Sequence, residues 1–92
     1  MFNTSKDLNH FRKELDTLDK ELIKVLEKRL KVVKAIGKYK SKNDLKPLDK
    51  KRWKKVLDSR IKLGKKVGLS STFIKDIFNS IHKYSLSLQR KL

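Results

Sequence analysis

The residues best suited to chemistry are polar groups at positions where a helix pattern requires apolar ones. Arg29 stands inside an apolar series, and burying a guanidinium there is costly unless an anion meets it. Lys40 follows eleven residues later, about three helical turns on, and so lies on the same side of a helix. Ser85 and Gln89 are four residues apart and bring hydrogen-bonding groups to a second apolar stripe.

Such groups suit a small dianion, most naturally a dicarboxylate, because guanidinium binds carboxylate in a bidentate manner. Arg12 lies 17 residues before Arg29, which is about 25 Å along a helix axis. It therefore reaches the same ligand only from a second chain whose long helix runs antiparallel. We expect a helix-lined pocket that combines Arg29 and Lys40 of one chain with the partner's Arg12.

Other kinds of catalytic chemistry find little support in the sequence. There is no cysteine, no glycine-rich phosphate loop and no metal-ligand spacing around the histidines, His10 and His82. We interpret His82 as an exposed or partly buried helix residue and not as a general base. We expect neither a metal nor a cofactor, and a catalytic pocket here would act by positioning and electrostatics.

A long helix must carry Arg29. Between Asp7 and Lys40 there is no proline, and positions spaced alternately three and four apart form what we call the seam. Nine of its ten positions are apolar or aromatic, which is typical of a helix that packs against other helices along its length. The seam consists of Leu8, Phe11, Leu15, Leu18, Leu22, Val25, Arg29, Val32, Ile36 and Tyr39.

The length of this helix predicts a dimer. The 34 residues from Asp7 to Lys40 would span about 50 Å as a helix. A compact domain of 92 residues is only about 30 Å across. A partner chain must then cover the rest of the seam, and a symmetric homodimer is the commonest solution.

The remaining pattern indicates two shorter helices and no strand. Asn43, Asp44 and Pro47 mark a loop, and Asp49 is a suitable N-cap for the next helix. We predict an all-α fold with a single domain at residues 1–92, built as an intertwined homodimer. The predicted helices cover residues 6–41, 49–67 and 70–91.

Charge is the strongest compositional feature: 26 Lys and Arg face 10 Asp and Glu, for a net charge of +16. Such a balance raises nucleic-acid binding as an interpretation. The cations are mostly lysines spread along the outer side of the first helix, whereas base readout and bidentate phosphate contacts favour arginine. We therefore interpret them as a solvated surface and do not expect nucleic acid as a partner.

The sequence also bears on location. No stretch is long and apolar enough to span a bilayer, and the N-terminus lacks an apolar run of signal-peptide length. The absence of cysteine fits a reducing compartment. We expect a cytoplasmic protein without a membrane partner.

Three segments, FRKELDTLDKELIKVLEKRLKVVKAIGKYK, PLDKKRWKKVL and IFNSIHKYSLSLQ, resemble the all-helical type II chorismate mutases. The resemblance runs from about Leu8 to Gln89, on three helices in the order found in the family. The family opens with an arginine, the pattern I/L-D-x-I/L-D and a leucine run. The matching residues here are Arg12, Leu15, Asp16, Leu18, Asp19 and Leu22.

The resemblance implies an intertwined homodimer that rearranges chorismate to prephenate, a step of aromatic amino acid biosynthesis in the shikimate pathway. It assigns the substrate carboxylates to Arg29 and the partner's Arg12, with Ser85 and Arg52 in support. It assigns the ether oxygen to Lys40 and Gln89, and the substrate hydroxyl to the neighbourhood of Asp49. In some relatives of this fold a partner enzyme activates the mutase, so an activating aromatic-pathway enzyme is a further implied partner.

Trp53 departs from the family pattern. It stands directly after Arg52, where the family usually places a glutamate that accepts the substrate hydroxyl, and it brings a bulky ring to the pocket edge. Two alternatives therefore stay open beside the mutase: a lyase that removes pyruvate from isochorismate, and a mutase of a modified chorismate. A third alternative, independent of Trp53, is a non-catalytic basic helical dimer with a regulatory or nucleic-acid-binding role.

Overall fold

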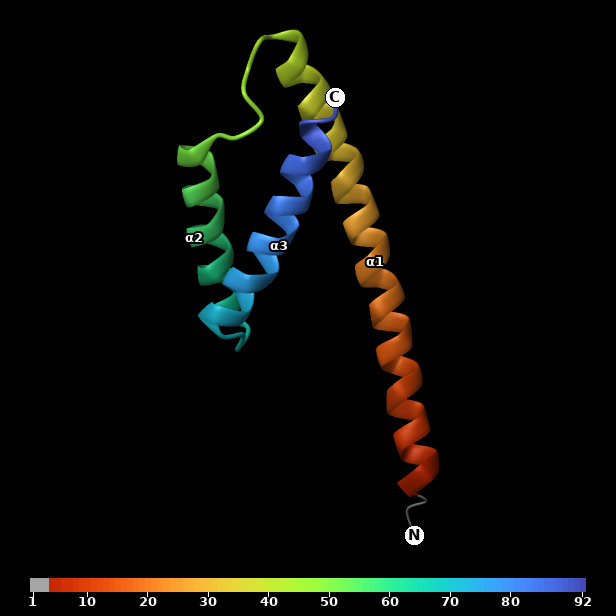
Figure 1. The fold of residues 1–92 in the computed structure, drawn as a ribbon. Helices are drawn as coiled ribbons and strands as arrows, with labels where there is room; N and C mark the ends of the chain where they lie inside the picture. The colour runs from red at the N-terminus through yellow and green to blue at the C-terminus, as the bar shows by residue number, and fades with distance from the viewer. Residues whose placement is uncertain (1–3) are drawn as a thin grey trace. The chain divides into compact units, whose positions relative to one another are not determined.

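The structure is a computed structural model that describes residues 4–92. The described residues form three α-helices and no strand, which confirms the predicted all-α class. Each helix begins and ends within two residues of the predicted bounds. In chain order (Figure 1) they are α1 (Thr4–Lys42), α2 (Lys50–Lys66) and α3 (Ser71–Gln89).

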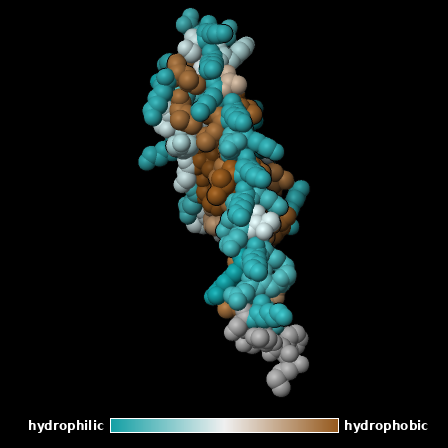
Figure 2. Space-filling model, turned by 90° about the vertical axis from the view of Figure 1, so that its right-hand side faces the viewer, coloured by the Kyte–Doolittle hydropathy of each residue, from teal (hydrophilic) through white to brown (hydrophobic). Residues whose placement is uncertain are grey.

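The chain forms two compact units, Met1–Val32 and Val33–Leu92. In the N-terminal unit the described residues belong to α1 alone, and every described apolar seam residue there is exposed, from 47% at Leu8 to 59% at Phe11. Brown, apolar side chains reach the surface among hydrophilic ones in Figure 2. A single amphipathic helix has no second element within its own unit against which to bury such a seam.

The C-terminal unit holds the end of α1 together with α2 and α3. Its core is small: Val33, Val56 and Ile74 are the apolar side chains buried within the described part of the chain, one from each helix. α2 packs directly against α3. Gly64 makes that contact close, since a Cβ atom there would lie 2.5 Å from Cγ1 of Ile74.

Two side-chain caps determine where the shorter helices begin. Asp49 Oδ1 accepts a hydrogen bond of 3.0 Å from the backbone N–H of Arg52, so the predicted N-cap of α2 is confirmed. Ser70 Oγ accepts one of 3.1 Å from the backbone N–H of Phe73 at the start of α3. Each cap satisfies a backbone donor that the first helical turn would leave without a partner.

Across residues 4–92, none of the helices is both long enough and apolar enough to cross a bilayer.

Candidate active site

The polar centre of the C-terminal unit is a pair of residues far apart in the sequence. Lys40, in the last turn of α1, donates a hydrogen bond of 3.3 Å from Nζ to Oε1 of Gln89, the last residue of α3. The same ammonium donates a shorter bond, 2.6 Å, to the carbonyl oxygen of Pro47 in the loop before α2. Both side chains are half-buried. The structure thus brings together two residues that the sequence placed in one site.

The chemistry of this pair follows from its donors and acceptors. An ammonium group only donates, so the amide oxygen of Gln89 must face Lys40 and the amide nitrogen keeps its two N–H groups for other acceptors. These two bonds use two of the three N–H groups of Lys40. The pair therefore offers a positive charge and N–H donors to a ligand, an arrangement suited to an oxygen that gains negative charge.

Ser85 lies one helical turn before Gln89 and is buried, with 5% of its surface exposed. Its hydroxyl donates a hydrogen bond of 2.8 Å to the carbonyl oxygen of Ile81 in the preceding turn. In this arrangement the proton is directed into the helix. To donate to a substrate carboxylate, as the family resemblance implies, the hydroxyl has to rotate away from Ile81.

Trp53 stacks on His82. Their ring centroids are 3.7 Å apart and their planes differ by 7°, and both side chains are half-buried. His82, Ser85 and Gln89 are spaced three and four residues apart, so they share one face of α3. The stack therefore borders the polar face of α3. Sequence reasoning did not place His82 at the site, although this spacing was available to indicate it.

Asp49 and Arg52 lie at the start of α2, and both are exposed. Oδ1 of Asp49 accepts the hydrogen bond of the helix cap. If Asp49 contacts the substrate hydroxyl, as the resemblance implies, it does so through its other carboxylate oxygen. The roles that the resemblance assigns to these two residues stay predictions.

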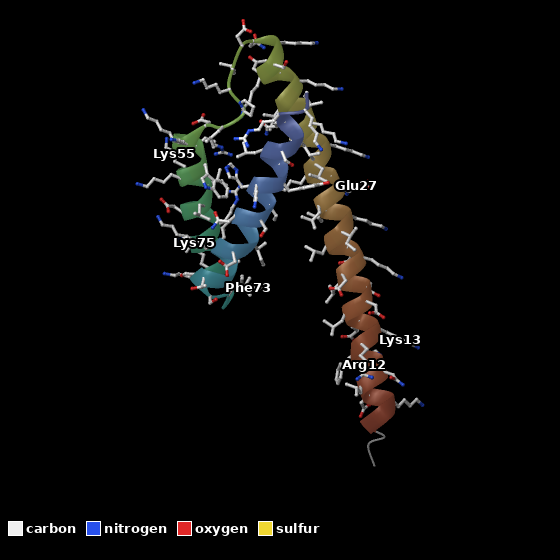
Figure 3. All side chains as sticks on the ribbon, viewed as in Figure 1. Arg12, Lys13, Glu27, Lys55, Phe73 and Lys75 are labelled. Carbon is white, nitrogen blue, oxygen red and sulfur yellow. The ribbon has the colours of Figure 1, made fainter. Side chains whose placement is uncertain are left out.

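Arg12 and Arg29 belong to the N-terminal unit. Arg12 is exposed near the start of α1 (Figure 3), and Arg29 is half-buried. Both lie on one continuous helix, so their 17-residue separation corresponds to about 25 Å along the axis. Within one chain, the structure does not bring these two guanidinium groups to a common small ligand.

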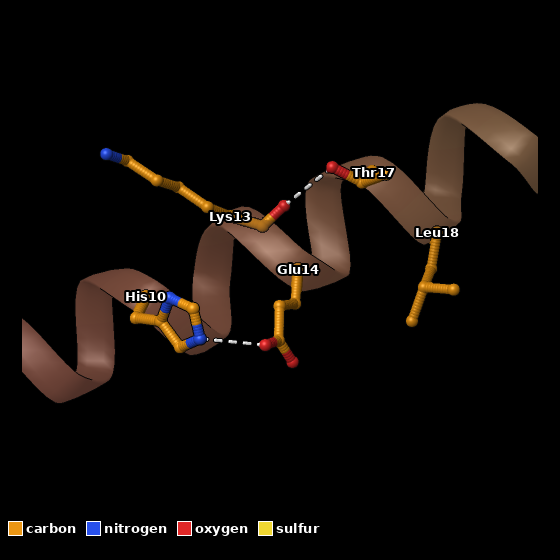
Figure 4. Close-up of a pocket in the computed structure, with 5 residues that line it drawn as sticks. All are labelled: His10, Lys13, Glu14, Thr17 and Leu18. Carbon is orange, nitrogen blue, oxygen red and sulfur yellow. Dashed lines mark hydrogen bonds and ion pairs between the residues drawn. The ribbon is translucent and has the colours of Figure 1, made fainter.

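A hollow of about 400 Å³ on α1 has none of these predicted residues in its lining. Among its lining residues, His10 Nε2 lies 2.8 Å from Glu14 Oε1, and Thr17 donates a hydrogen bond to the Lys13 carbonyl oxygen (Figure 4). Leu18 completes its lining. The hollow is one face of a single helix and opens widely to solvent, whereas small-molecule sites enclose most of their ligand. It is therefore a surface feature.

Comparison with known proteins identifies a family whose profile matches this chain. The profile described as chorismate mutase type II matches residues 11–90, a range that includes every predicted site residue. A bifunctional chorismate mutase/prephenate dehydratase of Buchnera aphidicola subsp. Acyrthosiphon pisum is 38% identical over 82 residues, covering 89% of this chain and 21% of that protein.

Two further relatives carry the same description. The protein of Buchnera aphidicola subsp. Schizaphis graminum is 36% identical over 89 residues, covering 97% of this chain and 23% of the relative. The protein of Aquifex aeolicus is 31% identical over 91 residues, covering 95% and 25%. This chain spans about a quarter or less of the length of these relatives. Because the family profile covers most of the sequence, the chain belongs to the chorismate mutase type II family.

Proposed function

We propose that this chain is an isomerase that rearranges chorismate to prephenate at a site centred on Lys40 and Gln89. The observation that carries the proposal is the Lys40–Gln89 hydrogen bond, which holds a cation and an amide side by side in a member of this family. The pair supplies N–H donors and no base, and the reaction needs no base.

The rearrangement takes place within one molecule. The ether C–O bond breaks while a new C–C bond forms, so nothing is added or lost and no proton has to move. Negative charge grows on the ether oxygen as its bond to carbon lengthens. Lys40 and the amide N–H groups of Gln89 stabilise that charge more in the transition state than in the bound substrate, which is the condition for a faster chemical step.

The substrate carboxylates require further cations, and we propose that a homodimer provides them. Two chains would pair with their long helices antiparallel, so that the partner's Arg12 joins Arg29 at one site. Support comes from the exposed apolar seam of α1. Burying the exposed half of one such side chain contributes about 1 kcal/mol. Two seams would then contribute on the order of 10 kcal/mol before the cost of association.

The direct test is product identification. Purified protein is incubated with chorismate, and the product is identified by NMR against authentic prephenate. We expect prephenate, and we expect its formation to collapse in Lys40→Ala. The matched control is Lys38→Ala, which removes the same charge from an exposed position on the same helix. If Lys40→Ala formed prephenate as fast as the wild-type protein, there would be no basis for placing the reaction at Lys40 and Gln89.

Trp53 favours one second candidate, the elimination of pyruvate from isochorismate to leave salicylate. Trp53 occupies the position where the family usually carries a glutamate, so that carboxylate is missing here. The Trp53 ring lies against His82. Incubation with isochorismate alone separates the two functions. Salicylate and pyruvate from isochorismate, without prephenate from chorismate, would replace the mutase by the lyase.

We also propose a cytoplasmic location and a partner that acts on prephenate. The relatives described above are named for chorismate mutase and prephenate dehydratase together in one protein. An enzyme that consumes prephenate is therefore the partner class to add to the assay. The lack of cysteine supports a reducing compartment.

A further inference from the structure

We infer that Gly37 is a positioning residue for Gln89. The missing side chain at position 37 determines how closely the last turn of α3 approaches α1, and thereby where the Gln89 amide meets Lys40. The effect on rate rests on the proposed function, in which Gln89 contacts the reacting ether oxygen. The contact between Gly37 and Gln89 does not depend on that function.

Gly37 is buried in the C-terminal part of α1, directly against the end of α3. A Cβ atom at this position would lie 3.1 Å from Cγ and 3.3 Å from Cα of Gln89. It would lie 2.8 Å from Cδ1 of Leu92. The Leu92 atom is the tip of a flexible side chain and can move aside. The Gln89 atoms are a helix backbone carbon and the stem of the side chain, so they move only if the turn moves.

The backbone does not explain why glycine is present. Gly37 lies inside a continuous helix and, unlike Gly68, does not adopt a positive φ. Alanine would fit that backbone and is the better helix former. What glycine provides at this position is space, because the absent Cβ lets the two helices come together.

Both ends of the Gln89 side chain are therefore located by the same face of α1. Gly37 and Lys40 are three residues apart and are neighbours on that face. Gly37 meets the Gln89 stem, while Lys40 meets the Gln89 amide oxygen at 3.3 Å. A methyl group at position 37 lifts the stem by a few tenths of an ångström and carries the amide away from its place beside the ammonium.

The first test is Gly37→Ala in steady-state kinetics with chorismate. Misplacing a reacting group by about 1 Å costs roughly a hundredfold in rate, so a smaller displacement predicts a fall in kcat of about tenfold, with KM changed less than about twofold. Gly64→Ala is the matched control, since it inserts a methyl group against Ile74 and meets neither Lys40 nor Gln89. It is expected to lower thermal stability and leave kcat per folded enzyme unchanged.

Two double variants distinguish an effect of Gly37→Ala that acts through Gln89 from one that acts through Leu92. Gly37→Ala with Leu92→Ala removes the closest contact and favours folding, yet kcat is expected to stay low because Gln89 remains displaced. In a Gln89→Ala background, Gly37→Ala is expected to change kcat by less than about twofold, since the group it acts through is gone. Recovery of kcat in the first double variant, or a full additional loss in the second, would overturn the inference.

A readout without substrate keeps this inference distinct from the mutase proposal. The side-chain amide signal of Gln89 is assigned by NMR as the signal that is present in the wild-type spectrum and missing from the spectrum of Gln89→Ala. It is expected to shift in Gly37→Ala with Leu92→Ala, and to stay in place in Gly64→Ala and in Leu92→Ala alone. An unmoved signal would refute the positioning role. Absence of prephenate from the wild-type protein, with the signal shifted, would refute the mutase alone.

Discussion

Gln89→Met is the sharpest perturbation of the proposed site. Methionine has nearly the same length as glutamine, so its stem still fills the space beside Gly37. The substitution removes the amide oxygen that accepts from Lys40 and the N–H groups proposed for the ether oxygen. Lys40 keeps its 2.6 Å bond to the Pro47 carbonyl oxygen, so the ammonium retains one of its two restraints.

The expected loss of rate is much larger than the expected loss of stability. Removing one preorganised donor to a developing oxyanion costs about a hundredfold to a thousandfold in kcat, or about 2.7 to 4 kcal/mol of transition-state stabilisation. The Lys40–Gln89 bond is long, at 3.3 Å, and half-buried. Its loss should lower the free energy of unfolding by about 1 kcal/mol or less.

Steady-state kinetics with chorismate measure the loss of kcat, and thermal unfolding by circular dichroism measures the loss of stability. Both are measured on the same preparation. Gln89→Ala serves as the companion variant, because it removes the stem as well as the amide. A Gln89→Met enzyme with kcat within about threefold of wild type, a difference below 1 kcal/mol, would show that the amide does not act on the reacting oxygen.

The remaining predictions address the hydroxyl end, the dimer and the start of α2. Trp53→Glu should lower the free energy of unfolding by about 1 kcal/mol through loss of the stack on His82, and should raise kcat because it restores an acceptor for the substrate hydroxyl; unchanged turnover would mean that another group already serves the hydroxyl. Leu18→Glu places a charge on the seam and should convert dimer to monomer in sedimentation velocity, while Lys20→Glu, off the seam, should not; a wild-type monomer would contradict the proposed assembly. Asp49→Ala should cost about 1 kcal/mol of stability by removing the N-cap, with Asp49→Ser retaining most of it; equal melting temperatures for all three proteins would show that the cap contributes little.

Local features of the sequence predicted the helices well. The three-to-four spacing of apolar residues and the Asp49 cap depend on neighbours within a few positions, so a single chain carries that information. Lys40 was placed at the site because it lies on the same side of its helix as Arg29, and Gln89 because it interrupts an apolar stripe of the third helix. Both features are visible without a structure.

Contacts between distant segments were not predictable in the same way. The Trp53–His82 stack, the Gly37 contact with Gln89 and the Pro47 acceptor all depend on how α2, α3 and a loop pack. Periodicity states which face of a helix is apolar, but not which atom lies opposite a given residue. Pro47 is the clearest case, since it was interpreted as a loop breaker and contributes through its main-chain oxygen.

That oxygen makes an ordinary surface connection part of the proposed reaction centre. Substitution of the Pro47 side chain leaves the carbonyl in place, so mutational scanning residue by residue would pass over it. Insertion or deletion is different, because either one moves the carbonyl away from the Lys40 ammonium. Among related chains, drift in the spacing between α1 and α2 should accompany changes in turnover more closely than drift in residue identity there.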